Sequence, residues 1–476
     1  MSDLQSLSTQ IQSRINSRSM GLKLIVVGVL ALAMTIPALF VSELVGERSR
    51  RADDVAKEIS DHVGGQQTFL GPTLAIPYDV PAQSVAGATV VSAVGDHGVY
   101  LVFPGQAEAR VKTHTEERHR SLFKVPVFQA DLSFDAAFDL TGVPRAAPTG
   151  AILRWDQAEL IIGVTDARGA LADGTVIING KTDTFLPTDN IEGLSVLPNS
   201  NQRTSLTLFA VEISKLAQPN AHFQVTTNLR FSGAQRIAIL AYGKSTRLNI
   251  QGDWPNPSFD GGFLPVRRTI SAQGFSGEWS VPFIARGIRA EGRSPSVAGL
   301  DATALGVSFI ELADPYQSVN RSLKYVLLFV GLLFLSYFVF EVTTGKRVHP
   351  AQYVLVGIAQ IIFYLLLLSL AERIGFDFGF LIAGAATVLL LSANAAWIFA
   401  SRLHGLRALV SLTLLYALIY LLLRLEDNAL LVGAVASFLA VAAVMYFTRK
   451  IDWYSSLPAP GQTPIATDSK VEIEEG

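Results

Sequence analysis

Residues 323–342 read LKYVLLFVGLLFLSYFVFEV, and this stretch decides the class of protein to which the chain belongs. Only Lys324 and Glu341 carry charge in it, and each lies close to one end. A helix of about 20 apolar residues crosses the roughly 30 Å hydrocarbon core of a bilayer. The segment therefore predicts a transmembrane helix.

Five further apolar segments surround this one in the sequence. They are residues 24–41, 353–371, 378–400, 409–425 and 429–447. The first is too long for the apolar region of a cleaved secretory signal, which has about 7–15 residues, and it has no clear small-residue cleavage pattern. We therefore predict six transmembrane helices, with a signal anchor at residues 24–42 and a five-helix bundle at residues 323–447.

Basic residues fix the predicted orientation. They cluster before the first span (Arg14, Arg18, Lys23), after the second (Lys346, Arg347, His349), after the fourth (Arg402, His404, Arg407) and after the sixth (Arg449, Lys450). Cytoplasmic loops carry the excess of Lys and Arg in membrane proteins. The pattern places both termini in the cytoplasm, at residues 1–23 and in a tail at 448–476 that is disordered at its end. Residues 43–322 then lie outside the cytoplasmic membrane.

The large outer segment begins with a predicted helix and continues as strands. Val55, Ile59 and Val63 recur at helical spacing in residues 52–63, which indicates a stalk helix that stops at Gly64. In residues 131–140 and 222–231, apolar and polar side chains alternate, which is typical of strands with one buried face. Further strand-like runs, at 73–78, 98–103, 159–165, 205–213 and 237–250, predict a predominantly antiparallel β domain. It is either two packed sheets or two subdomains that meet near residues 142–150.

One segment of this domain differs from its surroundings. Residues 254–265 read WPNPSFDGGFLP, and their prolines and glycines disfavour regular structure. Trp254, Phe259 and Phe263 supply apolar surface. We expect a loop that its aromatic side chains hold against the β core, and the alternative is an exposed lip that contacts a partner or lipid.

The composition excludes several classes of function. The formal net charge is −2, with 16% charged residues, which gives no basic field for nucleic acid. The chain has no cysteine, so it has no disulfide, thiolate metal site or cysteine nucleophile. His114 and His119 are five residues apart, which does not fit the zinc-protease spacing. We expect no metal, no cofactor and no catalytic residue, and we predict that the protein is not an enzyme.

The predicted spans contain few polar side chains. Gln360, Ser392 and Asn394 lie deepest, and each of them can join two helices by a hydrogen bond. A continuous polar path through all three would instead indicate transport. Glu341, Glu372 and Arg424 lie near predicted ends, where we expect them to reach headgroups or water.

Several sequence words together resemble a known family. They are QTFLGP at 67–72, IPY at 76–78, the segment at 254–265, YQSVNRSLKY at 316–325, HPAQYVLVG at 349–357, FYLLLLSLAE at 363–372 and MYFTRKIDWY at 445–454. This pattern is similar to the CreD family of inner-membrane proteins, which supports cell envelope integrity in Gram-negative bacteria. The resemblance implies a polytopic inner-membrane protein with a link to envelope stress, and it brings no catalytic residue. Residues 43–322, which the charge pattern places outside the cytoplasmic membrane, are then expected in the periplasm. In the last word, Arg449, Lys450, Trp453 and Tyr454 form a predicted anchor at the membrane interface.

These observations favour a non-enzymatic function. We expect the β domain to bind or brace an envelope component, with the lipid bilayer and possible envelope proteins or cell-wall components as partners. A transporter or lipid-handling protein is the first alternative. A periplasmic hydrolase is the second, and it requires two or more of His97, His114, His119, His222 and the nearby carboxylates to converge.

Overall fold

The structure is a computed structural model that describes residues 20–80, 96–120, 123–147, 150–188, 206–293, 299–309, 315–344, 346 and 348–424, with single positions between 431 and 449. The chain forms two compact units. The membrane unit comprises residues 1–49 and 313–476, and the β unit comprises residues 50–312.

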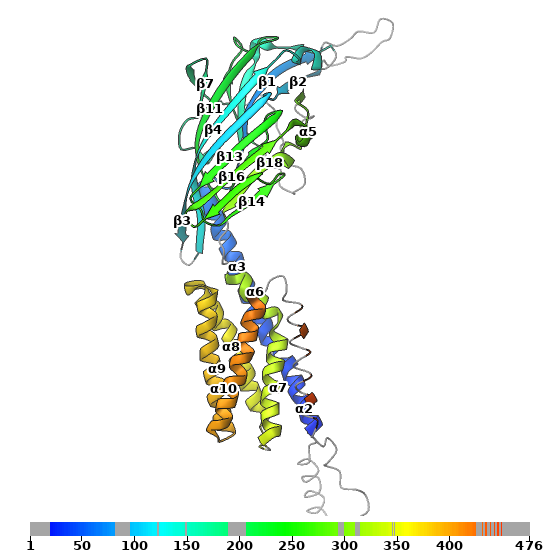
Figure 1. Ribbon diagram of the computed structural model, residues 1–476, viewed down its shortest axis with the longest axis vertical. Helices are drawn as coiled ribbons and strands as arrows, with labels where there is room; N and C mark the ends of the chain where they lie inside the picture. Colours follow the sequence, from blue (N-terminus) through cyan, green and yellow to red (C-terminus); the bar gives the residue numbers. More distant parts are fainter. Residues whose placement is uncertain are drawn as a thin grey trace, which may run out of the picture. The chain divides into compact units, whose positions relative to one another are not determined.

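The membrane unit is helical (Figure 1). Its helices are α2 (Met20–Ala33), α3 (Thr35–His62), α6 (Pro315–Lys324), α7 (Val326–Thr344), α8 (Pro350–Ile374), α9 (Phe376–Ile398) and α10 (Arg402–Arg424), and α3 continues into the β unit. In the described residues five helices are long and apolar enough to cross a membrane, counting α2 and α3 as one. These five confirm the first five predicted spans as apolar helices. The predicted sixth span, at residues 429–447, falls mostly outside the described residues.

Helix α2 packs against α7 and α8, as expected for a first helix that joins the bundle. A glycine makes this approach close. A Cβ at Gly357 of α8 would lie 2.6 Å from the Met34 sulfur and 3.0 Å from the Phe334 ring. Small residues at such positions let membrane helices pack closely, because lipid supplies little driving force between them.

The β unit contains two sheets that share one apolar core (Figure 1). The first sheet contains β1 (Gln67–Val80), β2 (Asp96–Val102), β5 (Ile152–Leu153), β6 (Glu159–Val164), β9 (Leu186–Pro187), β10 (Thr207–Glu212), β12 (Arg236–Leu240), β14 (Pro257–Gly261), β17 (Glu291–Arg293) and β18 (Ala304–Phe309). The second sheet has the order β15 (Arg267–Ser271), β16 (Gly274–Val281), β13 (Ser245–Gly252), β3 (Gln106–Arg120), β4 (Phe123–Asp139), β11 (His222–Ala234), β7 (Thr175–Ile178) and β8 (Lys181–Thr184). Short helices α4 (Val143–Ala146) and α5 (Phe283–Arg286) and the 3₁₀ turns η1 (Trp155–Gln157), η2 (Ala167–Gly169) and η4 (Leu300–Thr303) connect them.

The strand pairs are mostly antiparallel, with parallel pairing of β1 with β12 and of β3 with β13, so both sheets are mixed. The two alternating segments of the sequence form the neighbouring strands β4 and β11. Phe138 lies opposite Phe223, and their rings stack at 5.1 Å. The common core draws on both sheets, which favours two packed sheets over two subdomains.

Two local predictions for the β unit are wrong. The dipeptide Ser232-Gly233 is a common turn signal in sequences and predicts a turn here, but both residues lie inside β11 and pair with β4. Part of the segment at 254–265 is also a strand, since β14 pairs with β18 from Pro257 to Gly261. The proline fits because it is the first residue of a strand at the edge of the sheet, where no neighbour needs its missing N–H.

Candidate functional site

A buried carboxylate joins three segments of the membrane unit. The side chain of Glu341, on α7, is only 2% exposed. It forms an ion pair with Lys23 of α2, and it accepts hydrogen bonds from the Val348 N–H at 2.9 Å and from the Tyr353 hydroxyl at 3.1 Å. Lys23 also donates to the Val348 carbonyl at 2.8 Å. One carboxylate therefore connects the N-terminal helix to α7, to the α7–α8 connection and to α8.

The burial of Glu341 corrects the prediction that it reaches headgroups or water. Its position near the end of a span suggested exposure, but Lys23 from the other end of the chain covers it. Ionisable groups inside membrane proteins are rare, and they are paired when they are retained. Removal of one partner would leave the other charge unpaired, so this cluster is the strongest candidate functional site in the described part of the membrane unit.

A second polar contact lies deeper in the bundle. The Tyr416 hydroxyl of α10 donates to Gln360 Oε1 of α8 at 2.6 Å, and Gln360 is only 1% exposed. Gln360 Nε2 and the nearby Tyr364 hydroxyl are buried and make no hydrogen bond of regular geometry among the described residues, and the two side chains interact with each other. This contact joins α8 to α10, as the sequence indicated for a single polar residue in a span.

The other two intramembrane candidates lie in different surroundings. Asn394 of α9 interacts with the Tyr337 hydroxyl of α7, which donates to the Leu391 carbonyl at 2.7 Å. The Ser392 hydroxyl is buried and has no partner among the described residues. Gln360 therefore joins α8 to α10, whereas Asn394 joins α9 to α7, and in the described part of the bundle the two side chains do not share a contact.

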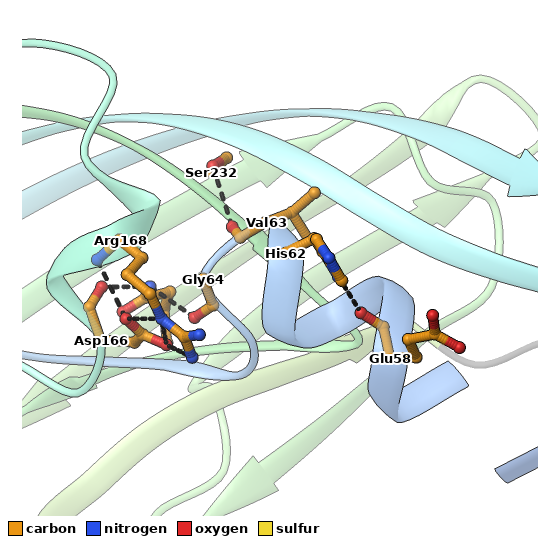
Figure 2. A network of polar contacts seen from close by, with 8 residues as sticks. Glu58, His62, Val63, Gly64, Asp166, Arg168 and Ser232 are labelled. Carbon is orange, nitrogen blue, oxygen red and sulfur yellow. Dashed lines mark hydrogen bonds and ion pairs between the residues drawn. The ribbon is translucent and has the colours of Figure 1, made fainter. Parts of the chain in front are cut away.

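Figure 2 shows where the end of α3 meets the β strands within the β unit. The Ser232 hydroxyl of β11 donates to the Val63 carbonyl at 2.9 Å, and Gln67 Nε2 donates to the carbonyls of Gly64 and Asp166 at 2.7 and 2.9 Å. Apolar side chains support the junction: Ala56, Ile59 and Val63 pack on Val125, Val127 and Ala234. The turn that directly follows α3 is thus bonded to a strand of each sheet through the carbonyls of Val63 and Gly64.

Charge and close packing reinforce this junction. The Arg168 guanidinium binds both Asp166 carboxylate oxygens, at 2.6 to 3.1 Å, and lowers the pKa of that carboxyl below its usual range. A Cβ at Gly169 would lie 2.4 Å from the Ser232 carbonyl oxygen and 2.6 Å from Gln67 Nε2. Only glycine fits at this position without moving backbone.

The aromatic residues of the segment at 254–265 pack on the core. Trp254 is 8% exposed, and its indole donates to the Asn256 carbonyl at 3.1 Å. Phe259 and Phe263 are half-buried against the core, and Phe259 meets the Trp279 ring at 5.8 Å. Trp279 donates to the Phe263 carbonyl at 3.0 Å. This packing favours a segment held against the core, and partner contact by the three aromatics stays a prediction.

Two histidines of the β unit contact separate carboxylates. His114 lies 2.5 Å from Asp253, and His222 lies 3.5 Å from Asp139. Among the described residues no three His, Asp or Glu side chains form a group that could hold a metal ion.

The predicted interface anchor falls at the end of the described chain. Of its members only Arg449 is described, with its guanidinium carbon 4.2 Å from the centre of the Tyr446 ring. Lys450, Trp453 and Tyr454 lie outside the described residues.

The sequence reasoning missed the role of Glu341 and Lys23. A signal was present, because an acidic residue at one end of a span and a basic residue at the same membrane face of another can pair. Nothing in the sequence selected this pair, which is 318 residues apart.

Comparisons with known proteins agree with the helical membrane unit. The family model described as inner membrane protein CreD matches residues 19–454. The inner membrane protein CreD of Escherichia coli strain K12 is 28% identical over 454 residues, which cover 93% of this chain and 96% of that protein.

Proposed function

This chain belongs to the CreD family of inner membrane proteins, and from that premise we propose that it supports the cell envelope by holding a ligand-binding or bracing domain at the membrane. The β unit is the part that binds or braces an envelope component. Six spans, with both termini in the cytoplasm, would place residues 43–322 in the periplasm. The protein acts without catalysis.

The observation that carries this proposal is that the α2–α3 segment is bonded to other elements within each unit. In the β unit, Ser232 and Gln67 donate hydrogen bonds to the carbonyls of Val63 and Gly64, which directly follow α3. In the membrane unit, Lys23 of the preceding helix α2 pairs with Glu341 of α7. A segment bonded within both units suits a protein that bears load or transmits a binding event.

Photo-crosslinking in intact envelopes tests the proposal. A photoreactive residue replaces Leu264 or Val266, which are 67% and 71% exposed at the C-terminal end of the segment at 254–265. Lys181, exposed on the edge strand β8, is the matched control position. We expect one envelope component to be captured from the first two positions and not from the control. Equal background at all three positions, or turnover of a lipid-linked precursor by the purified protein, contradicts the proposal.

A transporter or lipid-handling protein is the second candidate. Gln360 Nε2, Tyr364 Oη and Ser392 Oγ favour it, because they are buried without a hydrogen-bond partner in the described part of the bundle, and such atoms can line a polar path. Reconstituted protein separates the candidates. The Gln360→Leu variant is tested for a measured lipid or solute flux and for rescue of the envelope defect of a deletion strain. If it loses both, transport is the function and the bracing proposal is wrong.

A further inference from the structure

Within the described part of the β unit, one buried arginine has no anionic partner. Arg286 is the last residue of α5, between β16 and β17, and it is 3% exposed. Its Nε, Nη1 and Nη2 atoms have no hydrogen-bond partner among the described residues. Its guanidinium carbon lies 4.1 Å from the centre of the Phe103 ring.

This arrangement is unusual because a guanidinium carries five N–H donors. Contact with an aromatic face recovers part of the hydration free energy that the cation loses on burial, but the contact leaves all of these donors without a hydrogen-bond acceptor. Burial lowers the pKa of Arg286 to about 10, so the group is still positively charged at neutral pH. An oxyanion would satisfy the donors and the charge together, since the planar guanidinium binds phosphate or carboxylate through two parallel hydrogen bonds.

The surroundings of Arg286 indicate which oxyanion fits. Phe283 and Ile284 of the same short helix are 48% and 92% exposed, so an apolar surface lies beside the buried cation. Arg289 follows on the exposed side and adds positive charge. A phosphate that carries hydrocarbon matches this combination of a buried cation and exposed apolar side chains.

We propose that Arg286 binds the phosphate group of an envelope molecule, with Phe283 and Ile284 in contact with its apolar part. Because Arg286 is 3% exposed, the proposal requires the four-residue helix α5 to move aside, so that the anion can accept hydrogen bonds from the guanidinium N–H groups. This inference rests on the proposed function, because it names the ligand class of the same β unit. Crosslinking can still capture an envelope component if Arg286 has no role, so the two ideas fail separately.

Thermal unfolding of the full-length protein in dodecyl maltoside tests the proposal. The probes are dihexanoylphosphatidylglycerol, glycerol phosphate and uncharged dihexanoylglycerol, which separate a lipid headgroup from a free phosphate and from apolar contact alone. The variants are Arg286→Met and, as matched control, Arg289→Met, which removes an exposed charge three residues away. We expect the phosphatidylglycerol to raise the melting temperature of the wild type and of Arg289→Met. In Arg286→Met the half-saturating concentration should rise at least about tenfold, as for loss of a bidentate charged contact.

Each other outcome has a defined meaning. An equal, Arg286-dependent shift with glycerol phosphate supports the site and identifies a free phosphate ester as the source. Shifts that are the same in all variants, or that dihexanoylglycerol reproduces, overturn the proposal. Without probe, Arg286→Met should melt at or above the wild type, because it removes an unpaired buried charge. A large fall in its melting temperature overturns the proposal too, since it would mean that the guanidinium has a structural partner.

Discussion

Substitution of Glu341 tests how firmly the N-terminal helix is held. Glu341→Ala removes the ion pair with Lys23 and two accepted hydrogen bonds, and it leaves Lys23 unpaired where its side chain is only 21% exposed. Removal of one member of a buried pair costs about 3–5 kcal/mol. Lys23→Met should cost less, about 1–3 kcal/mol, because the carboxylate keeps its bonds from Val348 and Tyr353. In the double variant Lys23→Met/Glu341→Ala neither charge of the pair remains, so it should lose less than the sum of the two singles by about 0.5–3 kcal/mol.

Equilibrium unfolding in mixed micelles measures these free energies. Glu43→Ala is the control, because this residue is an exposed carboxylate on α3, and its loss should change stability by no more than about 0.5 kcal/mol. The reasoning is refuted if Glu341→Ala unfolds like the control, or if the effects of Lys23 and Glu341 simply add.

Three further predictions concern the junction and the bundle. Gly169→Ala should lower the free energy of unfolding by about 1–3 kcal/mol, because the new Cβ would lie 2.4 Å from a backbone oxygen. The control Gly142→Ala should be nearly neutral in the same thermal or chemical unfolding measurement, because a Cβ there has no atom within 4 Å. Equal effects of the two substitutions would contradict this. The pKa of Asp166 is lowered from 3.8, so its ion pair with Arg168 stabilises the fold above pH 3.8, and this stabilisation is lost as the pH falls through the folded-state pKa. Asp166→Asn should therefore make the free energy of unfolding depend less on pH in the acid range. An unchanged pH dependence would argue against the pair. Tyr416→Phe should lower the free energy of unfolding by about 0.6–1.7 kcal/mol, because it removes a hydrogen bond inside the bundle. In the same measurement Tyr364→Phe should be neutral or stabilising. The reverse order of the two effects would refute the assignment of partners.

Local periodicity predicted much of the fold. Apolar length gave the spans, and alternation gave β4 and β11, because both signals lie within one segment. The sequence could not predict the parallel pairing of β3 with β13, which joins residues 106–113 to residues 245–252. Such pairing depends on how distant strands share a core and leaves no local pattern.

The candidate site was harder to predict than the fold. Gln360 was identified from its polarity in an apolar span, and the structure gives it one helix contact. Glu341 was misjudged, because sequence position near a span end does not reveal which partner covers it. The strand at Pro257 was missed because proline excludes a central strand but not the first position of an edge strand.

The central claim is that the β unit lies outside the cytoplasm and the basic loops lie inside. The chain has no cysteine, so single-cysteine variants report without background. Ile284→Cys, at a 92% exposed position of the β unit, and Ala351→Cys, exposed at the start of α8, are treated with a membrane-impermeant maleimide in spheroplasts. The account predicts that Ile284→Cys is labelled in intact spheroplasts and that Ala351→Cys is labelled only after permeabilisation. Labelling of Ala351→Cys in intact spheroplasts, with Ile284→Cys protected, would contradict it.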